Sequence, residues 1–477
     1  MKLSAIRNTF GATAIAALVV AAVVLPGAAP ATAGSNAPNE SGGRAVAHSA
    51  GGKRLSSPAL AAAAPRTILS RIGVDSIEPT IGVAQNGDIF TSAYQTTTRI
   101  EVVRSQDKGK SWEIVSPKLP NGKNAQLLSL DPYTYADIPL GDKDSTRVFT
   151  IDLNVACSYL SFTDDNGESW TTNPLVCGRP VNDHQTLFGG PPVSSATIGY
   201  PNILYYCWND VATSSCQKSL DGGLTFTVTG SPAYPGVDQA GFCGGLHGHG
   251  VVDTKGVIYL PKDHCHEPFV SISKDEGLTW ERIRVAKDEL EGGPDPSVAV
   301  DKKGNIYYLY ADTERIPHLV VSKDGGKTWS KPVNVAAPGV NETNLATLAV
   351  GAPGKVAISY MGTVNAPSGP VEEREAADYR ETTWNGYITQ TTDALQNNQV
   401  FYSSTVNNKR DPLLRGQCEQ RNRCRPVFDF IDVVIDRSGD IWSAWVDGCI
   451  AICSTTGPGN IGGDGVVGRT FGINMSR

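Results

Sequence analysis

Four of the seven histidines in this 477-residue chain lie close together, in the stretch GLHGHGVVDTKGVIYLPKDHCHEP. His247 and His249 are two residues apart, as are His264 and His266, so each pair would share one face of an extended strand. Imidazole nitrogens can bind a metal ion, and they can act as a general base near neutral pH. This segment is therefore the first candidate for a functional site.

A cage of all four histidines conflicts with the cysteines beside them. If Cys243 pairs directly with Cys265, the first histidine pair shares a face with Asp263, and the second pair points to the opposite side unless a bulge shifts the register. A smaller site is then expected, in which His247, His249 and Asp263 bind a divalent metal ion such as calcium or zinc. The alternative is that these are hydrogen-bonded histidines without a metal or other cofactor.

Carboxylates at comparable places in four different repeats suit a second kind of chemistry. Glycoside hydrolysis needs one protonated and one ionised carboxyl group, and crowding of like charges raises one of the two pKa values. The candidates for this acid and base work are Glu78, Asp183, Asp295 and Asp432, with His247 as a further catalytic candidate. The alternative is that these groups cap strands or bind a calcium ion.

Substrate-binding candidates follow from the same placement. Histidines can orient a ligand through hydrogen bonds, and aromatic rings can stack on the faces of sugars. We expect these roles for His184, His249, Tyr94, Trp208, Tyr310 and Trp445, although aromatic residues in strands are as often part of the core.

The elements that position these residues recur seven times along the chain. Each repeat has a short apolar run, a turn containing glycine and an alternating β-rich run, as in SVAVDKKGNIYYLYAD and DVVIDRSGDIWSAWVD. The turn glycines are Gly87, Gly141, Gly199, Gly256, Gly304, Gly354 and Gly439. Repeats of about fifty residues with this pattern predict a β-propeller.

A second motif follows the first five of these hairpins. It has the form S/T-x-D-x-G-x-x-W/F and reads SQDKGKSW, TDDNGESW, SLDGGLTF, SKDEGLTW and SKDGGKTW. The aspartate can accept backbone N–H groups in a tight turn, the glycine allows a left-handed conformation, and the aromatic ring packs under the turn. The motif is therefore structural rather than catalytic.

This motif is the Asp-box, and the chain resembles the Asp-box, or BNR-repeat, β-propellers of the sialidase-like superfamily. The resemblance implies an all-β fold with a single propeller and Asp-boxes at the turns between the third and fourth strands of each blade. We expect seven four-stranded blades, with six as the alternative. The ends of the strands opposite the Asp-boxes should then form the functional face.

The family's catalytic motifs are not recognisable in this sequence. Sialidases of the superfamily bind the substrate carboxylate with three arginines, one of them in an (F/Y)-R-I-P motif that opens the first blade. Here Glu78 and Pro79 stand at that place, and the RIP at Arg315 precedes an Asp-box strand, so we interpret it as coincidental. True sialidase activity is therefore not expected.

The N-terminal residues predict export. Residues 1–33 have the basic, apolar and small-residue regions of a secretory signal peptide, residues 34–66 have the composition of a flexible linker or propeptide, and residues 67–477 carry the propeller. Ten cysteines in an exported chain predict disulfides between sequence neighbours. The expected pairs are Cys157–Cys177, Cys207–Cys216, Cys243–Cys265, Cys418–Cys424 and Cys449–Cys453.

Charge and composition limit the partners. The net charge is −7, with no basic block, so nucleic acid and membrane insertion are not expected. The leading hypothesis is a secreted monomeric glycoside hydrolase acting on an extracellular glycan. The alternatives are a polysaccharide lyase using histidine and tyrosine, and a non-catalytic secreted propeller that binds a glycan or a protein.

Overall fold

Antiparallel strands account for almost all regular structure in this chain. The computed structural model describes residues 40–95, 99–126, 129, 131–140, 146–153, 157–177, 182–210, 213–238, 241–288, 290, 295–375, 377–416, 429–449 and 463–477. The predicted signal peptide lies outside these residues, and residues 33–477 form a single unit. None of the described helices is long and apolar enough to cross a bilayer.

Four sheets have the predicted four strands. The first contains β8 (Tyr133–Asp137), β9 (Arg147–Leu153), β10 (Cys157–Thr163) and β11 (Thr171–Cys177). The second contains β12 (Asp183–Gly190), β13 (Ile203–Asp210), β14 (Thr213–Ser219) and β15 (Thr227–Val228). The third contains β18 (Val251–Val252), β19 (Ile258–His264), β20 (Glu267–Ser273) and β21 (Glu281–Arg284). The fourth contains β22 (Ser297–Val300), β23 (Ile306–Ala311), β24 (Pro317–Ser322) and β25 (Val333–Asn334).

Two larger sheets complete the fold. A six-stranded sheet contains β26 (Glu342–Val350), β27 (Val356–Thr363), β28 (Thr383–Thr391), β29 (Phe401–Thr405), β2 (Val46–His48) and β30 (Leu414–Arg415). A nine-stranded sheet contains β31 (Asp432–Ile435), β32 (Ile441–Asp447), β33 (Gly463–Phe471), β3 (Arg66–Ser76), β1 (Glu40–Arg44), β4 (Ile81–Val83), β5 (Ile89–Gln95), β6 (Arg99–Ser105) and β7 (Glu113–Ile114). β16 (Val237–Asp238) and β17 (Gly241–Phe242) form a separate ribbon.

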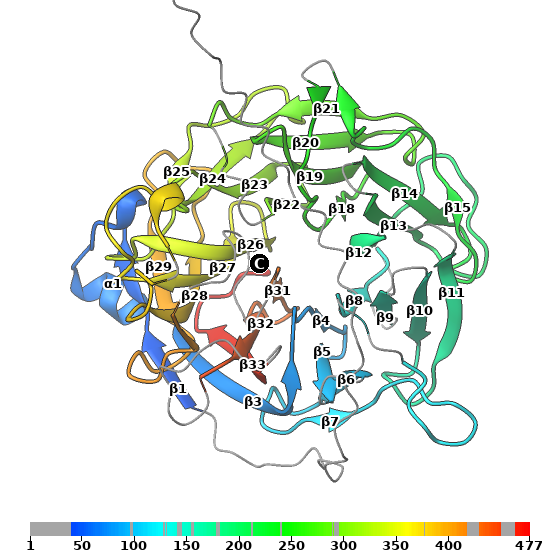
Figure 1. The fold of residues 1–477 in the computed structure, drawn as a ribbon, viewed down its shortest axis with the longest axis horizontal. Helices are drawn as coiled ribbons and strands as arrows, with labels where there is room; N and C mark the ends of the chain where they lie inside the picture. The colour runs from blue at the N-terminus through cyan, green and yellow to red at the C-terminus, as the bar shows by residue number, and fades with distance from the viewer. Residues whose placement is uncertain are drawn as a thin grey trace, which may run out of the picture. The chain divides into compact units, whose positions relative to one another are not determined.

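These sheets form a β-propeller, as predicted. Figure 1 shows the first strand of each repeat around a common centre, with the later strands farther out. The inner strands β4, β8, β12, β18, β22, β26 and β31 are neighbours in that order, and β31 lies beside β4. Second strands such as β13 and β32 are buried along almost their whole length because a sheet packs on each of their faces. The core therefore lies between sheets.

The number of separate sheets differs from the prediction of seven four-stranded blades. Strand β3 pairs with β33 over most of its length, and its residue Asp75 also pairs with Tyr94 of β5. This second pairing joins two groups of strands into the nine-stranded sheet. The pairing of β3 with β33 also links the N-terminal part of the chain to its last strand.

The segment predicted to be a flexible linker contains regular structure in its described part, residues 40–66. It contains β1, β2, the short 3-10 helix η1 (Ala50–Gly52) and α1 (Pro58–Ala63). Strand β2 pairs with β29, and His48 is buried there against Ser403, with a distance of 2.7 Å between Nε2 and Oγ. The sequence missed this because small residues such as Ala45 and Ala47 can be buried without showing a hydrophobic period.

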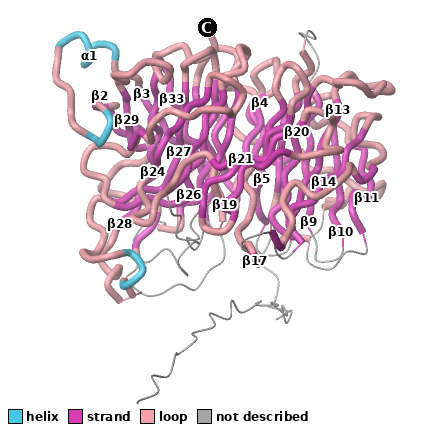
Figure 2. The backbone as a smooth tube through the Cα atoms, turned by 90° about the horizontal axis from the view of Figure 1, so that it is seen from above, coloured by secondary structure: helices cyan, strands magenta, loops and turns pink. Residues whose placement is uncertain are grey.

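The Asp-boxes form the turns between third and fourth strands. In the first box, Asp107 Oδ1 accepts the backbone N–H groups of Lys110 and Ser111, each at 2.9 Å. Gly109 follows with a φ of 79°, which a side chain would disfavour. In the side view of Figure 2, the strands run between two opposite faces. Because first strands run antiparallel to second strands, the starts of the first strands lie on the face opposite the Asp-boxes.

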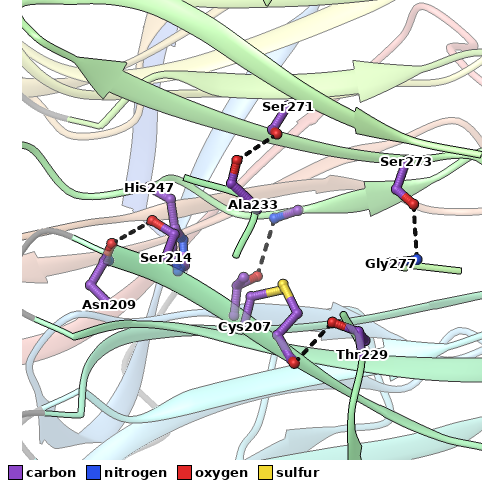
Figure 3. Close-up of a disulfide and its surroundings, with 12 residues drawn as sticks. Cys207, Asn209, Ser214, Thr229, Ala233, His247, Ser271, Ser273 and Gly277 are labelled. Atoms are coloured by element: carbon purple, nitrogen blue, oxygen red, sulfur yellow. Dashed lines mark hydrogen bonds between the residues drawn. A yellow bond between two sulfur atoms is a disulfide. The ribbon is translucent and has the colours of Figure 1, made fainter. Parts of the chain in front are cut away.

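Two predicted disulfides are present among the described residues. Cys207 and Cys216 join adjacent positions of β13 and β14 (Figure 3), and Cys243 joins Cys265. Cys157 and Cys177 are backbone partners, but their side chains lie outside the described part. Cys449 is disulfide-bonded, whereas its predicted partner Cys453 and the pair Cys418–Cys424 are not among the described residues.

Candidate functional site

Polar residues from different repeats meet where the inner strands begin. Glu78 precedes β4, His184 begins β12, and Asp295 precedes β22. In three repeats, a residue other than glycine near the start of the inner strand has a positive φ. The values are 45° at Glu78, 50° at His184 and 55° at Leu345. Such backbone strain in residues other than glycine is concentrated at functional sites. The axial cluster, as we call the side chains at this end of the inner strands, is the candidate site.

An ion pair crosses the axial cluster. His184 Nε2 lies 2.6 Å from Asp295 Oδ2, and the exposed fractions of the two side chains are 2% and 15%. Burial alone would lower the pKa of His184, but the charge and hydrogen bond of Asp295, with the charges of Asp131 and Asp429, raise it to about 10. His184 is therefore an imidazolium at neutral pH, and it can donate a hydrogen bond to a ligand but cannot act as a general base.

A second pair consists of two carboxyl groups. The side chains of Glu78 and Asp131 are hydrogen-bonded to each other. Burial, followed by the charges of Asp131 and Asp429, raises the pKa of Glu78 well above its usual value. Burial and the charge of Asp183 raise the pKa of Asp131 to about 6. One proton is therefore shared by this pair at neutral pH.

The predicted catalytic carboxylates are largely engaged with the backbone. Glu78 Oε1 accepts the N–H of Asp429 at 3.0 Å. Asp432 Oδ2 accepts the N–H of Ile81 at 3.1 Å, and Asp432 Oδ1 accepts the N–H of Val433 at 2.8 Å. Burial raises the pKa of Asp432 to about 7 in spite of these bonds. The carboxylates of Glu78 and Asp432 thus join the last repeat to the first one.

Asp131 and Asp183 occupy the start of the next repeats. Asp131 Oδ2 accepts the backbone N–H of His184 at 3.0 Å. Asp183 is half-buried, and its negative charge raises the pKa of Asp131. Among the predicted acids, Asp183 and Asp295 are therefore the two that the structure places at partly accessible positions. Asp429, also half-buried, is a third.

His247 and His249 belong to the axial cluster as neutral side chains. Burial and then the charge of His184 lower the pKa of His249 to about 3, and they lower the pKa of His247 well below its usual value. His247 Nδ1 bonds Gly248 O at 3.0 Å, which leaves the Nε2 lone pair as an acceptor. Both Nε2 atoms are buried without a hydrogen-bond partner among the described residues.

An aromatic ring packs against these histidines. The ring of Phe430 lies 5.4 Å from that of His184 and 5.4 Å from that of His249, measured between centroids. Tyr133 contacts the other edge of His249 at 5.1 Å. The predicted lyase partners of the histidines, Tyr94 and Tyr310, do not make these contacts.

A small cavity lies within the axial cluster. Its volume is about 30 Å³, and its lining includes His184, His249, Asp295, Asp429 and Phe430. The Nδ1 atom of His184 has no hydrogen-bond partner among the described residues. The residues that line the cavity therefore include two histidines with nitrogens that have no hydrogen-bond partner among the described residues, two aspartates and one aromatic ring.

The predicted metal site is not assembled. His247, His249 and Asp263 do not bring three ligand atoms together, and the group of described residues that does so is Cys243, His264 and Cys265, within 4.8 Å. The two cysteines form a disulfide and offer no thiolate. His264 instead packs on Tyr234 and Phe269, with centroid distances of 5.3 and 5.5 Å, so the four-histidine cage is not formed either.

Four predicted sugar-stacking rings are buried between sheets. The exposed fractions are 0% for Trp208 and Trp445, 1% for Tyr310 and 6% for Tyr94. Trp208 and Trp445 lie in hydrophobic clusters, and the hydroxyl of Tyr310 bonds Asp288. Their ring faces are therefore not available to a ligand, and the alternative that they belong to the core is correct.

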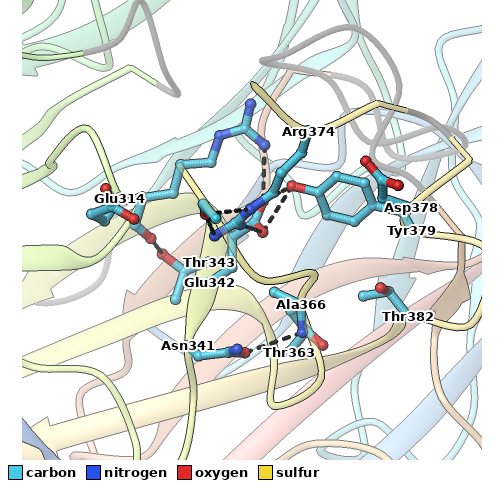
Figure 4. A network of polar contacts seen from close by, with 12 residues as sticks. Glu314, Asn341, Glu342, Thr343, Thr363, Ala366, Arg374, Asp378, Tyr379 and Thr382 are labelled. Carbon is cyan, nitrogen blue, oxygen red and sulfur yellow. Dashed lines mark hydrogen bonds and ion pairs between the residues drawn. The ribbon is translucent and has the colours of Figure 1, made fainter. Parts of the chain in front are cut away.

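The RIP sequence proves to be part of a buried polar network. Glu342, at the start of β26, pairs with Arg315 at 3.0 Å and with Arg374 at 2.6 Å, and the hydroxyl of Tyr379 lies 2.9 Å from both of its oxygens (Figure 4). Arg374 and Tyr379 belong to the insertion that contains the 3-10 helix η2 (Val371–Glu373). This network attaches the insertion to β26 and gives Arg315 a structural role.

Sequence reasoning missed Asp131 and Phe430 as members of the site, and it gave no role to Asp429. One signal was present for Asp131: Glu78, Asp131 and Asp295 are each followed by proline just before an inner strand. Another acidic residue of that repeat, Asp137, ends β8 and accepts hydrogen bonds from Tyr200 and Asn202 at 2.6 and 2.8 Å.

Comparison with known proteins supports the repeat assignment. Residues 152–375 match the model of the BNR repeat-like domain. Among curated proteins, no match was found.

Several solved propellers show a distant structural similarity. The Aleuria aurantia lectin, as a mutant in complex with α-methyl-L-fucoside, is 10% identical, with 67% of this chain and 92% of that chain covered and a TM-score of 0.43. The leech intramolecular trans-sialidase is 14% identical, with 78% of this chain and 65% of that chain covered and a TM-score of 0.35. The Trypanosoma rangeli sialidase is 12% identical, with 74% of this chain and 56% of that chain covered and a TM-score of 0.39. Similarity at these values carries no argument about the activity of this chain.

Proposed function

We propose that this BNR-repeat β-propeller is a secreted protein that binds a glycan at its axial cluster. The observation that carries the proposal is the cavity lined by His184, His249 and Phe430. It offers a donor and an acceptor without hydrogen-bond partners beside an aromatic ring. A few placed polar groups next to an apolar surface suit a ring that carries hydroxyl groups, such as a sugar.

Binding is favoured over hydrolysis because of what the carboxylates do. A hydrolase needs two carboxyl groups facing the substrate with about 5 to 9.5 Å between them. Glu78 and Asp432 are instead bonded to backbone N–H groups of neighbouring repeats, and Glu78 is 2% exposed. These bonds support a role in closing the ring rather than in proton transfer to a ligand.

A hydrolase remains the second candidate, and one observation favours it. Asp295 lines the cavity, and its Oδ2 is paired with Nε2 of His184. A charged carboxylate in such a place can act as a base or a nucleophile. Asp429, which also lines the cavity, is the candidate for the partner role.

One experiment separates these functions. The purified protein is presented with a panel of extracellular glycans, and binding by calorimetry, release of reducing ends and ultraviolet absorbance of an unsaturated product are measured on the same samples. Binding with neither product supports the proposal, reducing ends identify a hydrolase, and absorbance identifies a lyase. If no glycan binds and none is cleaved, the proposal is wrong.

A substitution in the site is compared with one on an exposed side chain outside it, under conditions in which both variants are folded. Asp295→Asn should weaken binding, whereas Glu281→Gln should not, because Glu281 lies on β21 with a side chain that is 66% exposed. Equal effects of both variants would contradict a role of the axial cluster.

We also infer that the propeller has seven blades. The nine-stranded sheet contains the group β4–β7 and the group β31, β32, β33 and β3, joined by the pairing of Asp75 with Tyr94. Counting these two groups separately gives one blade for each inner strand. An experimental structure at high resolution would test this count.

A further inference from the structure

We propose that the axial cavity receives the protonated amine of an amino sugar within the bound glycan. This inference rests on the proposed function and specifies its ligand. It is drawn from the charge around the cavity, from the unpaired nitrogens that line it, and from its size.

The charge of the axial cluster favours a cation. Asp183, Asp295 and Asp429 are half-buried there, and the Glu78–Asp131 pair carries a further negative charge. The cation among the described members of the cluster is His184, and Asp295 compensates it at 2.6 Å. The remaining negative charge attracts a cationic group and repels a uronate or a sialic acid carboxylate.

A nearby lysine offsets only part of this charge. Lys262 is buried, and its Nζ donates to Ser214 Oγ at 3.2 Å and lies 5.4 Å from the centre of the Tyr234 ring. Its charge interacts with that of Asp295, but Lys262 is not among the residues that line the cavity, and its single charge does not balance the several carboxylates of the cluster.

The buried nitrogens supply hydrogen bonds of the right kinds. His184 is 2% exposed and lines the cavity with an Nδ1–H that has no partner among the described residues. His249 lines the same cavity with an unpartnered Nε2, and this imidazole is neutral. An ammonium group can donate to His249 and to Asp429, and a neighbouring sugar hydroxyl can accept from His184.

The size of the cavity fits one such group. The cavity volume of about 30 Å³ exceeds the roughly 10–15 Å³ that one water molecule needs, so a small polar group such as an ammonium can enter it. The sugar ring would remain outside with only its amine inserted. The ring of Phe430 forms part of the wall, and a cation against an aromatic face gains a further attraction.

A bare metal ion fits this place less well than an amine. Calcium needs six to eight oxygen ligands around one point. The described acidic and histidine side chains of the axial cluster do not bring even three ligand atoms within 4.8 Å of one another. Carboxylates that are spread around a cavity suit a ligand that extends over several of them.

The test compares oligosaccharides that differ only in charge. Binding of glucosamine oligomers is measured by calorimetry against N-acetylglucosamine oligomers and uronate oligomers of equal length, with the full chain at neutral pH. We expect the amine form to bind at least about tenfold more tightly than the acetylated form, corresponding to ~1.4 kcal/mol. The preference should shrink with added salt.

Variants locate the effect. Asp429→Asn should reduce the preference for the amine by about tenfold while leaving the melting temperature close to that of the wild type, and Glu281→Gln should leave the preference unchanged. If Asp429→Asn fails to fold, Asp183→Asn serves in its place, since Asp183 is half-buried in the same cluster.

The outcomes distinguish this inference from the proposed function. Equal binding of neutral and amine forms, or a preference for the uronate, overturns the inference while the glycan-binding function stands. Stabilisation by calcium alone, without any glycan binding, overturns both. Loss of the preference in Asp429→Asn supports both.

Discussion

His184 Nε2 and Asp295 Oδ2 are 2.6 Å apart although their strands are not adjacent. His184 begins β12 and Asp295 precedes β22, while β18 stands between these strands in the ring. The ion pair therefore joins repeats that no sheet hydrogen bond connects. Its charges are buried, so losing one partner leaves an uncompensated charge.

This pair predicts a loss of stability at alkaline pH. The pKa of His184 is raised from its usual value of 6.5 to about 10, so protonated His184 stabilises the fold fully below about pH 6.5, and this contribution disappears as the pH rises through about 10. Urea unfolding at a series of pH values should show this decline. In Asp295→Asn the alkaline decline should shift to lower pH, with a cost of about 3 kcal/mol at neutral pH. An unchanged pH profile in this variant would contradict the ion pair.

Glu276 predicts the opposite pH dependence. Its Oε1 accepts the N–H groups of Val193, Ser194 and Ser195 at 2.7 to 2.9 Å, and Oε2 pairs with Lys218 at 2.9 Å. Although burial acts in the other direction, these hydrogen bonds hold the pKa of Glu276 below its usual value. The stabilisation is present above the unfolded pKa of about 4.5 and is lost as the pH falls through the folded value.

Glu276→Gln should therefore lower the free energy of unfolding by about 1 to 3 kcal/mol at neutral pH, and the difference from the wild type should vanish in acid. Glu281→Gln, on an exposed side chain of the same blade, is the matched control. Equal stability of the two variants at neutral pH would show that the contacts of Glu276 with the third repeat do not stabilise the fold by this amount.

The sequence predicted the parts of the fold that depend on local turns. The Asp-boxes lie between third and fourth strands because their serine or threonine, aspartate and glycine fix a turn without help from the rest of the chain. Comparison of the repeats with one another also placed Glu78, His184 and Asp295 near the starts of inner strands. Their meeting at the axis follows from the repeat alone.

The roles of these residues depend on contacts between distant repeats. Asp432 reaches the backbone of Ile81, which is 351 residues away, and Glu78 reaches that of Asp429. No local pattern distinguishes a carboxylate that bonds a neighbouring repeat from one that faces a ligand. The aromatic rings were misassigned for a related reason, because β-strands buried on both faces lack the polar alternation that marks an exposed side.

Gly248 predicts a steric requirement of the site. It lies between the two histidines, and a Cβ atom there would be 2.0 Å from the carbonyl oxygen of Pro296, beside Asp295. Gly248→Ala should therefore displace His249 and Asp295, lower stability by about 1 to 3 kcal/mol and abolish ligand binding. Gly244→Ala is the control because its Cβ would meet nothing within 4 Å. Calorimetry and thermal unfolding of both variants check this prediction, which fails if Gly248→Ala binds like the wild type.

The two described disulfides should differ in their effect on binding. Cys243–Cys265 ties the segment before His247 to the end of β19, whereas Cys207–Cys216 joins neighbouring strands that are already paired along seven residues. Replacing either pair by serine should cost about 2 to 4 kcal/mol, because each disulfide restricts the unfolded chain. Only the loss of Cys243–Cys265 releases the segment that carries the histidines, so only this double variant should lose ligand affinity at a temperature where both remain folded. Circular dichroism establishes that temperature, and calorimetry then measures affinity. If both double variants lose affinity equally, the disulfide beside the histidines has no special part in positioning them.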